Sequence, residues 1–182
     1  MRPKGDDVRY EIYRYICSNN LEGQCGIVYC LTCKDAENTA EYLNKCGLKA
    51  EYYHGGLTNA RRHAVQQQWM TGASHVMCTN VAFGLGIDKS DVRYVVHSTM
   101  PLSLEAYYQQ VGRAGRDHVL AWAVLFYRAR DRLRIDHVIS VNNTPRPTAP
   151  ASAQTRDGDA EHVISGTRCT SVHERSTNRL VS

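Results

Sequence analysis

Arg93-Tyr94-Val95-Val96-His97 is followed by the helix-like segment Leu104 to Val111 and then by Ala121-Trp122-Ala123-Val124-Leu125-Phe126-Tyr127. The two outer runs are short and rich in apolar and β-branched residues, a composition typical of buried strands. The middle segment has the length and spacing of a helix, and Ser103 stands before it as an N-cap residue. A strand, a helix and a strand in this order predict part of a parallel sheet that is covered by helices.

The same alternation continues upstream. Further strand-like runs and helix-like segments are, in chain order, Cys25-Gly26-Ile27-Val28-Tyr29-Cys30, Asp35 to Cys46, Ala50-Glu51-Tyr52-Tyr53, Thr58 to Met70 with Thr58 as N-cap, and His75-Val76-Met77-Cys78-Thr79. We therefore expect an α/β fold, with a mostly parallel sheet flanked by helices on both faces. In such sheets ligands bind beyond the carboxyl ends of the strands, so the loops after Thr79 and His97 are the first places to search for a site.

The sequence changes character after Tyr127, which is its last aromatic residue. From Asn142 onward it is rich in Thr, Ser, Pro, Arg and Asp, and the proline-rich stretch from Thr144 to Pro150 breaks helices. A segment of this kind lacks the apolar residues that would offset its ordering entropy. The predicted organisation is one folded domain over residues 1–141 and a disordered low-complexity tail over residues 142–182.

Composition alone excludes few classes of protein. The 182 residues suit about one domain, and the formal charge of +4 permits a polyanionic partner without requiring one. Most of the seven cysteines lie in apolar runs, and no secretory segment begins the chain, so we expect reduced thiols in a cytosolic or nuclear protein that is not secreted. No run approaches the roughly 18 apolar residues of a membrane span, and the isolated pair Cys30 and Cys33 is given no metal.

Phosphate chemistry is indicated by the stretch Gln109-Gln110-Val111-Gly112-Arg113-Ala114-Gly115-Arg116-Asp117. Glycines let a polyanion approach the backbone, and Arg113 and Arg116 would share one face if the segment is helical. A guanidinium holds phosphate oxygens in a fixed fork and stays charged at any working pH. The alternative is a glycine-capped helix end whose arginines are incidental.

A second candidate is the loop Thr79-Asn80-Val81-Ala82-Phe83-Gly84-Leu85-Gly86-Ile87-Asp88-Lys89, which leaves a predicted strand. Its glycine amides can approach phosphates, and Asp88 can accept hydrogen bonds from a ribose hydroxyl. For an isolated loop, a simple turn with Gly84 and Gly86 at positive φ and Asp88 as a cap is the alternative. The arginine segment downstream favours the ligand-binding interpretation.

In this context the sequence resembles the RecQ-type DNA helicases, over about residues 8–140. The motifs that carry the resemblance are, in order, Gly26 to Cys30, Tyr53-His54-Gly55-Gly56-Leu57, Thr79 to Lys89, Asp91 to His97, and Tyr107-Tyr108-Gln109 to Asp117. DEAD-box RNA helicases share the general plan, but they typically carry a histidine before the GRxGR element and lack Ala82-Phe83-Gly84 and the Tyr-Tyr-Gln lead-in. RecQ is the better match.

The resemblance implies a second RecA-like motor lobe that acts with ATP and Mg²⁺, both held mainly by a first lobe. No GxxxxGK[ST] segment occurs in the 182 residues. By analogy, Arg116 is the arginine finger and Arg113 lies beside it, whereas Gln109, Gly86, Asp88 and Gly112 form the nucleotide side of the site, with Gln109 and Gln110 linking the segment to the loop at Asp88.

The resemblance also implies contacts with single-stranded or forked DNA, mostly to its backbone. The residues it points to are His54, Arg61, Thr79, Asn80, Phe83 and Gly84. Taken alone, His54 is a packed histidine, and Arg61-Arg62 is equally well a solvated helix face. The basic stretch from Arg128 to Arg134 could extend a nucleic-acid-binding surface along the lobe, but acidic residues interrupt its charge, and a solvated helix is the favoured interpretation.

The sequence departs from the family at several positions. Ser90 replaces a usual proline, Asn80 replaces a small residue, and His118 stands where many members have glycine after the Arg-Asp pair. The zinc-binding cysteines and the winged-helix module that follow the motor in many members are missing, since Cys169 is the sole cysteine downstream. The turn around His118 is the place where these departures bear most on local structure.

Three functions remain open at this point. The first is the second motor lobe of an ATP-dependent helicase that moves 3′ to 5′ in DNA unwinding, repair and recombination, nuclear in a eukaryote and inactive without its first lobe. The second is a nucleic-acid or protein binding module without turnover. The third is a truncated product whose tail begins where a reading frame was lost. No membrane partner is expected from any of them.

Overall fold

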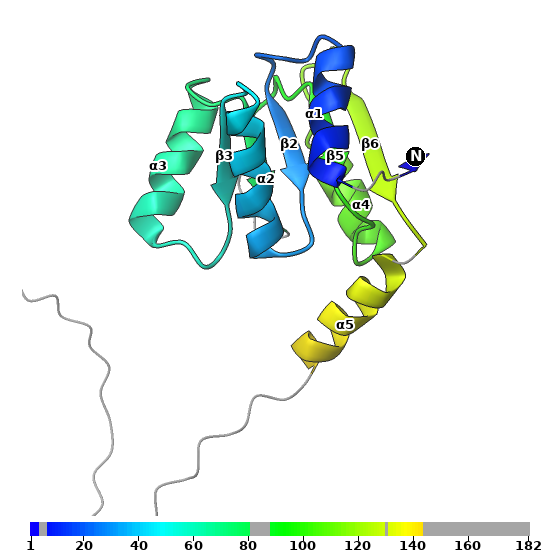
Figure 1. Cartoon of the computed structure of the whole chain (residues 1–182). Helices are drawn as coiled ribbons and strands as arrows, with labels where there is room; N and C mark the ends of the chain where they lie inside the picture. The colour runs from blue at the N-terminus through cyan, green and yellow to red at the C-terminus, as the bar shows by residue number, and fades with distance from the viewer. Residues whose placement is uncertain (4–6, 81–87, 130, 144–182) are drawn as a thin grey trace, which may run out of the picture. The chain divides into compact units, whose positions relative to one another are not determined.

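A computed structural model describes residues 1–3, 7–80, 88–129 and 131–143 (Figure 1). The elements are, in order, β1 (Arg2–Pro3), α1 (Val8–Ser18), β2 (Gly26–Tyr29), α2 (Cys33–Lys45), β3 (Ala50–Tyr53), α3 (Asn59–Met70), β4 (Val76–Thr79), β5 (Tyr94–His97), α4 (Leu104–Val111), β6 (Trp122–Tyr127) and α5 (Asp131–Asn143). They form a six-stranded sheet in the order β1-β6-β5-β2-β4-β3, and each pair of neighbouring strands is parallel. The predicted α/β fold with a parallel sheet is confirmed.

Local sequence explains where the helices begin. Thr58 and Ser103 cap α3 and α4 by accepting hydrogen bonds from the backbone N–H groups of Arg61 and Ala106, as predicted. Helix α2 starts two residues earlier than predicted, because the Thr32 hydroxyl accepts from the backbone N–H of Asp35. Helix α1 was not predicted, although Asp7 caps it and it buries residues at helical spacing, namely Ile12, Tyr15 and Ile16.

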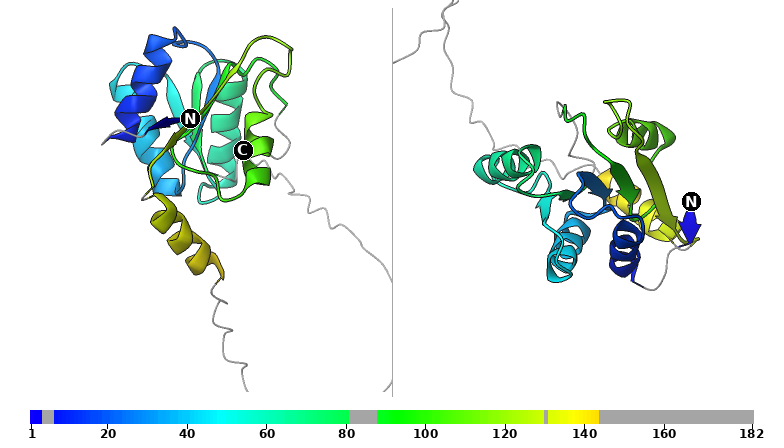
Figure 2. Two further views of the ribbon diagram at one scale, coloured as in Figure 1. Left: turned by 90° about the vertical axis from the view of Figure 1, so that its right-hand side faces the viewer. Right: turned by 90° about the horizontal axis from the view of Figure 1, so that it is seen from above.

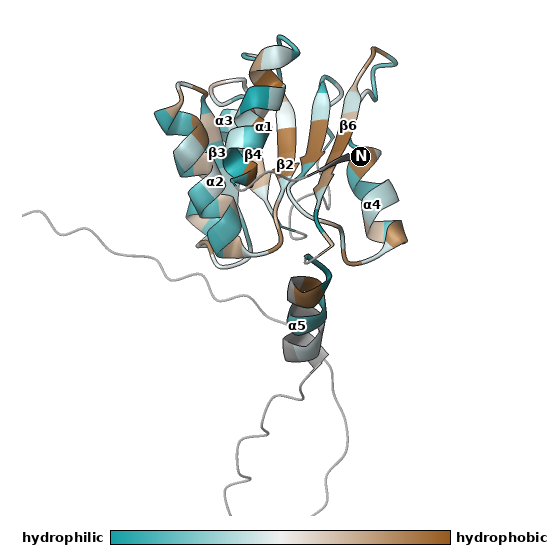
Figure 3. Cartoon of the chain, turned by 45° about the vertical axis from the view of Figure 1, so that its right-hand side comes forward, coloured by the Kyte–Doolittle hydropathy of each residue, from teal (hydrophilic) through white to brown (hydrophobic). Residues whose placement is uncertain are grey.

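Helices cover both faces of the sheet, and each face has its own core (Figure 2). On one face α1 and α2 pack on the strands through side chains that include Ile16, Leu43 and Val28. On the other face Val65 and Trp69 of α3 pack against strand residues, with Val111 of α4 partly buried beside them. Colouring by hydropathy shows brown on the strands, whereas α2 is mostly teal (Figure 3). Together the two cores fix the strand ends that carry the candidate site.

A close approach of strands requires a glycine at position 26. Gly26 of β2 lies in register with Tyr94 of β5, and the fully buried Tyr94 ring fills the space that a Cβ at position 26 would occupy. The indole N–H of Trp69 also donates to the carbonyl oxygen of Gly26 over 3.3 Å. Gly26 is therefore a packing glycine at the centre of the sheet.

The C-terminal part of the described chain ends in α5, which continues through Asn143, two residues past the predicted domain boundary at 141. One compact unit spans Met1–Pro145. The predicted tail falls outside the described residues from position 144 onward, and its disorder stays a prediction. None of the described helices combines the length and the apolar character that crossing a bilayer requires.

Candidate functional site

The carboxyl ends of three neighbouring strands meet at one edge of the sheet. Tyr29 ends β2 in register with both Thr79 at the end of β4 and His97 at the end of β5. The chain therefore leaves β4 and β5 at the same edge of the sheet, on either side of the end of β2, which is the edge where the alternation of strands and helices predicted a site. The arginine segment follows α4, the helix that begins shortly after the second of these loops.

The arginine segment is a turn rather than a continuation of the helix. Helix α4 ends at Val111 with Gly112 as its cap, so Arg113 and Arg116 lie beyond it. The Arg116 Nη1 atom donates to Asp88 Oδ1 over 3.0 Å, and its Nε atom reaches the carbonyl oxygen of Gly112 over 3.4 Å. Two residues predicted for one site, 28 positions apart in the chain, are thus brought into contact.

The pair formed by Arg116 and Asp88 faces solvent. The Asp88 side chain is 91% exposed and that of Arg116 is 36% exposed. Ion pairs in such surroundings add little to stability, because water and salt screen them. The ion pair with Asp88 is therefore weak, and Arg116 can exchange this carboxylate for another anion.

Arg113 points into the protein instead. Its Nε atom is buried and finds no acceptor among the described residues. Burial raises the pKa of the neighbouring Tyr29 hydroxyl to about 12, and the Arg113 guanidinium offsets this only in part. A buried donor without a partner costs free energy that an anionic ligand bound to Arg113 would recover.

Three aromatic rings pack together between the sheet and α4, the helix that leads into the arginine segment. The sequence did not predict this stack. The His97 ring stacks on Tyr29 with centroids 5.3 Å apart and lies 5.2 Å from the Tyr107 ring of α4. Its Nε2–H group donates to Gln110 Oε1 over 2.9 Å. Burial lowers the pKa of His97, the bond to Gln110 opposes this shift, and the ring is accordingly neutral at pH 7.

The two glutamines of the segment have different positions. Gln110 faces the interior and bonds to His97, whereas Gln109 is exposed, as is Gly112. The predicted link from the glutamines to Asp88 is not seen in the described part of the chain, where Arg116 reaches Asp88 directly. The predicted roles of Gln109 and Gly112 at the nucleotide stay predictions.

Left-handed backbone shapes the turn that follows the arginines. Gly115 has a φ of +67°, and a Cβ there would lie 3.0 Å from the carbonyl oxygen of Val119. His118 has a φ of +62°, which explains why glycine is usual at this position in the family that the sequence resembles. Gly112, in contrast, has an ordinary φ of −66°. The turn depends on Gly115 and tolerates a strained His118.

Replacing His118 with Gly is expected to raise the free energy of unfolding by about 0.5 kcal/mol, because relief of the left-handed strain exceeds the added entropy of the unfolded glycine. Urea unfolding measures this effect. The matched variant Gly115→Ala is expected to change stability in the opposite direction, since its Cβ would be both strained and crowded. A less stable His118→Gly protein would show that imidazole contacts outweigh the strain.

Among the predicted strand contacts, Thr79 and Asn80 lie at the carboxyl edge. The Thr79 side chain is fully buried, and its hydroxyl donates to the carbonyl oxygen of Tyr53 over 2.7 Å. The Asn80 Nδ2 atom donates to Cys33 Sγ over 3.4 Å. Thr79 therefore links the ends of β4 and β3 from a buried position, whereas Asn80 is partly exposed at this edge. Phe83, Gly84 and Gly86 lie outside the described residues.

His54 and Arg61 lie around the start of α3, and both have carboxylate partners. His54 is 5% exposed, stacks on Tyr52, and its Nε2 atom lies 3.2 Å from Glu37 Oε1. The Arg61 Nη2 atom lies 2.9 Å from Glu51 Oε2, with the arginine side chain 44% exposed. Arg61 is accessible for a phosphate contact, while any contribution of His54 passes through the loop that it supports.

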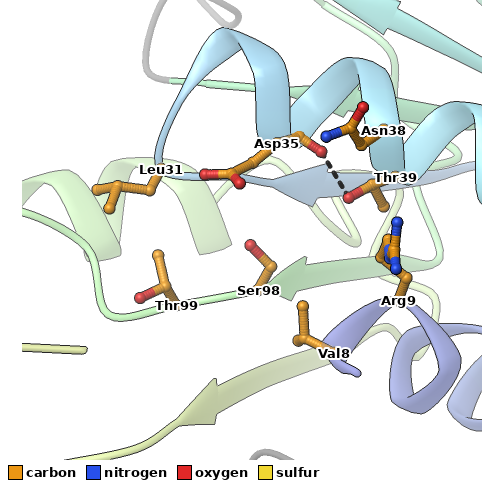
Figure 4. A pocket seen from close by; sticks show the side chains of 8 residues that line it. All are labelled: Val8, Arg9, Leu31, Asp35, Asn38, Thr39, Ser98 and Thr99. Atoms are coloured by element: carbon orange, nitrogen blue, oxygen red, sulfur yellow. Dashed lines mark hydrogen bonds between the residues drawn. The ribbon is translucent and has the colours of Figure 1, made fainter. Parts of the chain in front are cut away.

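A pocket of about 160 Å³ opens at the same edge, beside the start of α2 (Figure 4). It is lined by Val8, Arg9, Leu31, Asp35, Asn38, Thr39, Ser98 and Thr99. The Asp35 carboxylate accepts a hydrogen bond from the Thr32 hydroxyl over 2.8 Å and so occupies the helix N-terminus. Arg9 is already paired with Asp7 over 2.8 Å. The Asp35 carboxylate repels an anion, and the charge of Arg9 is already neutralised by Asp7, so this pocket is a poor site for an anion.

Comparison with known proteins gives consistent matches. A family model described as the helicase conserved C-terminal domain matches residues 8–118. The sequence is 42% identical over 138 residues to the ATP-dependent DNA helicase Q-like 4B of Arabidopsis thaliana, a match that covers 76% of this chain and 12% of that protein. It is 45% identical over 122 residues to the RecQ-like DNA helicase blm-1 of Caenorhabditis elegans, covering 67% of this chain and 12% of that protein.

Solved structures share the fold at lower identity. A DEAD box protein from Methanococcus jannaschii superposes with a TM-score of 0.60 and 24% identity, covering 76% of this chain and 38% of that one. The Escherichia coli DEAD-box protein SrmB gives a TM-score of 0.64 and 22% identity, covering 71% of this chain and 77% of that one. The sequence is thus similar to the RecQ-like proteins. The DEAD-box structures share the fold of this lobe.

Proposed function

Because the chain belongs to the helicase conserved C-terminal domain family, and within it to the RecQ type, we propose that it is the second motor lobe of an ATP-dependent DNA helicase. The observation that carries the proposal is the contact of Arg116 with Asp88, in the turn that also holds Arg113 and lies beside the amino ends of β5 and β6. The chain spans 12% of the length of each of these two relatives, so the activity proposed is that of a larger assembly.

Arg113 and Arg116 fit the phosphate end of a nucleoside triphosphate. The ion pair of Arg116 with Asp88 is exposed, and Arg113 has a buried Nε donor without an acceptor in the described ranges. Both would neutralise phosphate charge, with Gln109, Gly112 and Asp88 beside them. Bound ATP with Mg²⁺ supplies the phosphoanhydride bond whose hydrolysis drives the motor, and we assign its main binding groups to a first lobe.

The proposed substrate is single-stranded or forked DNA, bound through its backbone. Arg61, in the first turn of α3, offers an accessible charge, and Asn80, directly after β4, offers a partly exposed amide. By family, we further propose movement from 3′ to 5′ and a nuclear role in DNA unwinding, repair and recombination. A binding module without turnover is the second candidate, and it is favoured by the lack of a GxxxxGK[ST] segment in this sequence.

The purified chain alone is expected to show no ATP hydrolysis stimulated by single-stranded DNA, because its sequence contains no GxxxxGK[ST] phosphate-binding loop. Phosphate release is measured with and without oligo(dT), and then again after a first lobe of a RecQ helicase is added as a separate chain. Stimulated turnover in the mixture supports the motor proposal. DNA-dependent hydrolysis by the chain alone would contradict the need for a first lobe, and DNA binding without turnover in the mixture would favour the binding module.

A further inference from the structure

A second pocket, of about 170 Å³, lies at the amino ends of the strands. Its walls come from the end of α1 and the turn that follows it, from the turn between α2 and β3, and from the first residues of β4 and β5. The aliphatic side chains that line it are those of Ile16, Leu21, Leu48 and Val76, all part of the core on the face of α1 and α2. The arginine segment packs through Ala114 on the opposite face, so the sheet separates the two places.

The ring of Tyr94 reaches across the sheet toward this pocket. Tyr94 is the first residue of β5, and its ring lies over Gly26, the residue of β2 in register with it. Val76 of β4 is in register with Gly26 on the other side and lines the pocket, as does Tyr94 itself. Because the hydroxyl is the far end of the ring, it is directed past Gly26 toward β4 and the pocket.

The Tyr94 hydroxyl is a buried donor without an acceptor. The side chain is fully buried, and its Oη atom has no hydrogen-bond partner among the described residues. Burial raises the pKa of this hydroxyl, so it keeps its proton at neutral pH and is available as a donor. A donor in this state costs free energy that a ligand with a suitably placed acceptor would recover.

Backbone hydrogen bonds hold the walls of the pocket in place. The N–H groups of His75 and Val76 both donate to the carbonyl oxygen of Lys49, over 2.8 and 3.0 Å. On the side of α1, the N–H group of Leu21 donates to the carbonyl oxygen of Ile16 over 3.0 Å. The pocket is therefore formed before any ligand binds, which lowers the entropy that binding costs.

The lining determines which kind of molecule the pocket suits. Its walls are mostly aliphatic, and the lining residues Glu22 and Lys49 are exposed and opposite in charge, so an ion gains no net attraction from them. An apolar cavity of about 150 Å³ in another protein takes up benzene. By that measure, this pocket has room for one aromatic ring with one small substituent.

We propose that this pocket binds a small neutral molecule that has one aromatic ring and an acceptor for a hydrogen bond from the Tyr94 hydroxyl. The ring packs among the aliphatic walls, and the single polar contact fixes its orientation. The proposal does not depend on the proposed function, because neither ATP nor DNA takes part in it and the arginine segment lies on the other face of the sheet.

The test uses two probes of nearly the same shape, benzonitrile and phenylacetylene, of which the nitrile has the better acceptor. Each is titrated into the full chain, and NMR follows the signals of Leu21, Leu48 and Val76. For the wild-type chain we expect benzonitrile to bind about fivefold more tightly than phenylacetylene. In Tyr94→Phe the two probes are expected to bind equally. Tyr10→Phe, which removes a hydroxyl from a half-exposed side chain on α1, should keep the wild-type difference.

A second variant fills the pocket. Leu48 is partly buried at its wall, so Leu48→Trp is expected to abolish binding of both probes while still unfolding cooperatively in urea. If Leu48→Trp does not fold, Leu48→Phe, a smaller addition, serves in its place and should weaken both probes at least about fivefold. Undiminished binding to a folded filling variant would show that the probes bind elsewhere and would overturn the proposal.

Stability gives a readout without any probe. Tyr94→Phe is expected to unfold at a higher urea concentration than the wild-type chain, since it removes a buried donor that has no acceptor. A lower midpoint would show that the hydroxyl already has a partner, such as a bound water, and would overturn the assignment. The same holds if benzonitrile does not bind the wild-type chain, or if its advantage over phenylacetylene survives in Tyr94→Phe.

Discussion

Replacing Arg116 with Ala is expected to lower ATP hydrolysis by on the order of 10³-fold in the chain combined with a RecQ first lobe. The reason is the charge that develops on the transferred phosphoryl group, which the guanidinium of an arginine finger at position 116 would stabilise. The effect on folding should be small, because the ion pair of Arg116 with Asp88 is exposed and its hydrogen bond to the Gly112 carbonyl oxygen is long. Hydrolysis is measured at saturating oligo(dT), and nucleotide binding is followed separately with a fluorescent ATP analogue.

The control for Arg116→Ala is Arg132→Ala, which removes an equal charge from an exposed position on α5. It should leave both hydrolysis and nucleotide binding within about twofold of the wild-type values, as expected for a surface position. If Arg116→Ala turns over at the wild-type rate, Arg116 is not the finger. If it loses nucleotide binding as well as turnover, its role is in binding rather than in the transition state.

Replacing Gly26 with Ala is expected to destabilise the fold by about 3 kcal/mol, near the upper end for overpacking in a core. The new Cβ would overlap the Tyr94 ring, which is fully buried and has no room to retreat. Relief by moving β2 away from β5 would break the pairing at the centre of the sheet. Urea unfolding followed by circular dichroism measures the loss.

Gly55→Ala is the control for Gly26→Ala, since a Cβ at Gly55 meets nothing within 4 Å. It should change stability by less than about 0.5 kcal/mol. Combining Gly26→Ala with Tyr94→Leu should recover part of the loss, because leucine leaves space where the ring was. Equal stability of the Gly26→Ala and wild-type chains would show that the sheet accommodates the clash by relaxing.

Periodicity in the sequence predicted five strands and three helices because each is either a continuous apolar run or a capped segment with helical spacing. Helix α1 escaped prediction, since its buried residues Ile12, Tyr15 and Ile16 are separated by charged and aromatic side chains that dilute the pattern. Strand β1 has two residues, too few to show any period. Its pairing with β6 is set by tertiary structure alone.

The candidate site was predicted in its residue types but not in its pairings. Motif order indicated Arg113, Arg116 and Asp88, whereas the contact of Arg93 with Asp117 and that of His97 with Gln110 depend on strand register and on the turn after α4. No local pattern in the sequence carries that information. His118 is the exception: its departure from the glycine usual in the family marked the turn around it, and the structure shows that this residue has a positive φ.

The two cores of the sheet determine how the lobe responds to force. Successive residues of β2 point to opposite faces, so Val28 packs with α1 and α2 while Ile27 and Tyr29 pack with α3 and α4. Both cores are close-packed and resist compression, so a push at the end of one strand is shared by both layers. The sheet and its two helix layers therefore deform little under load. In a motor of the proposed kind, displacement at the carboxyl edge moves the lobe as one body, and little mechanical work is lost in bending it.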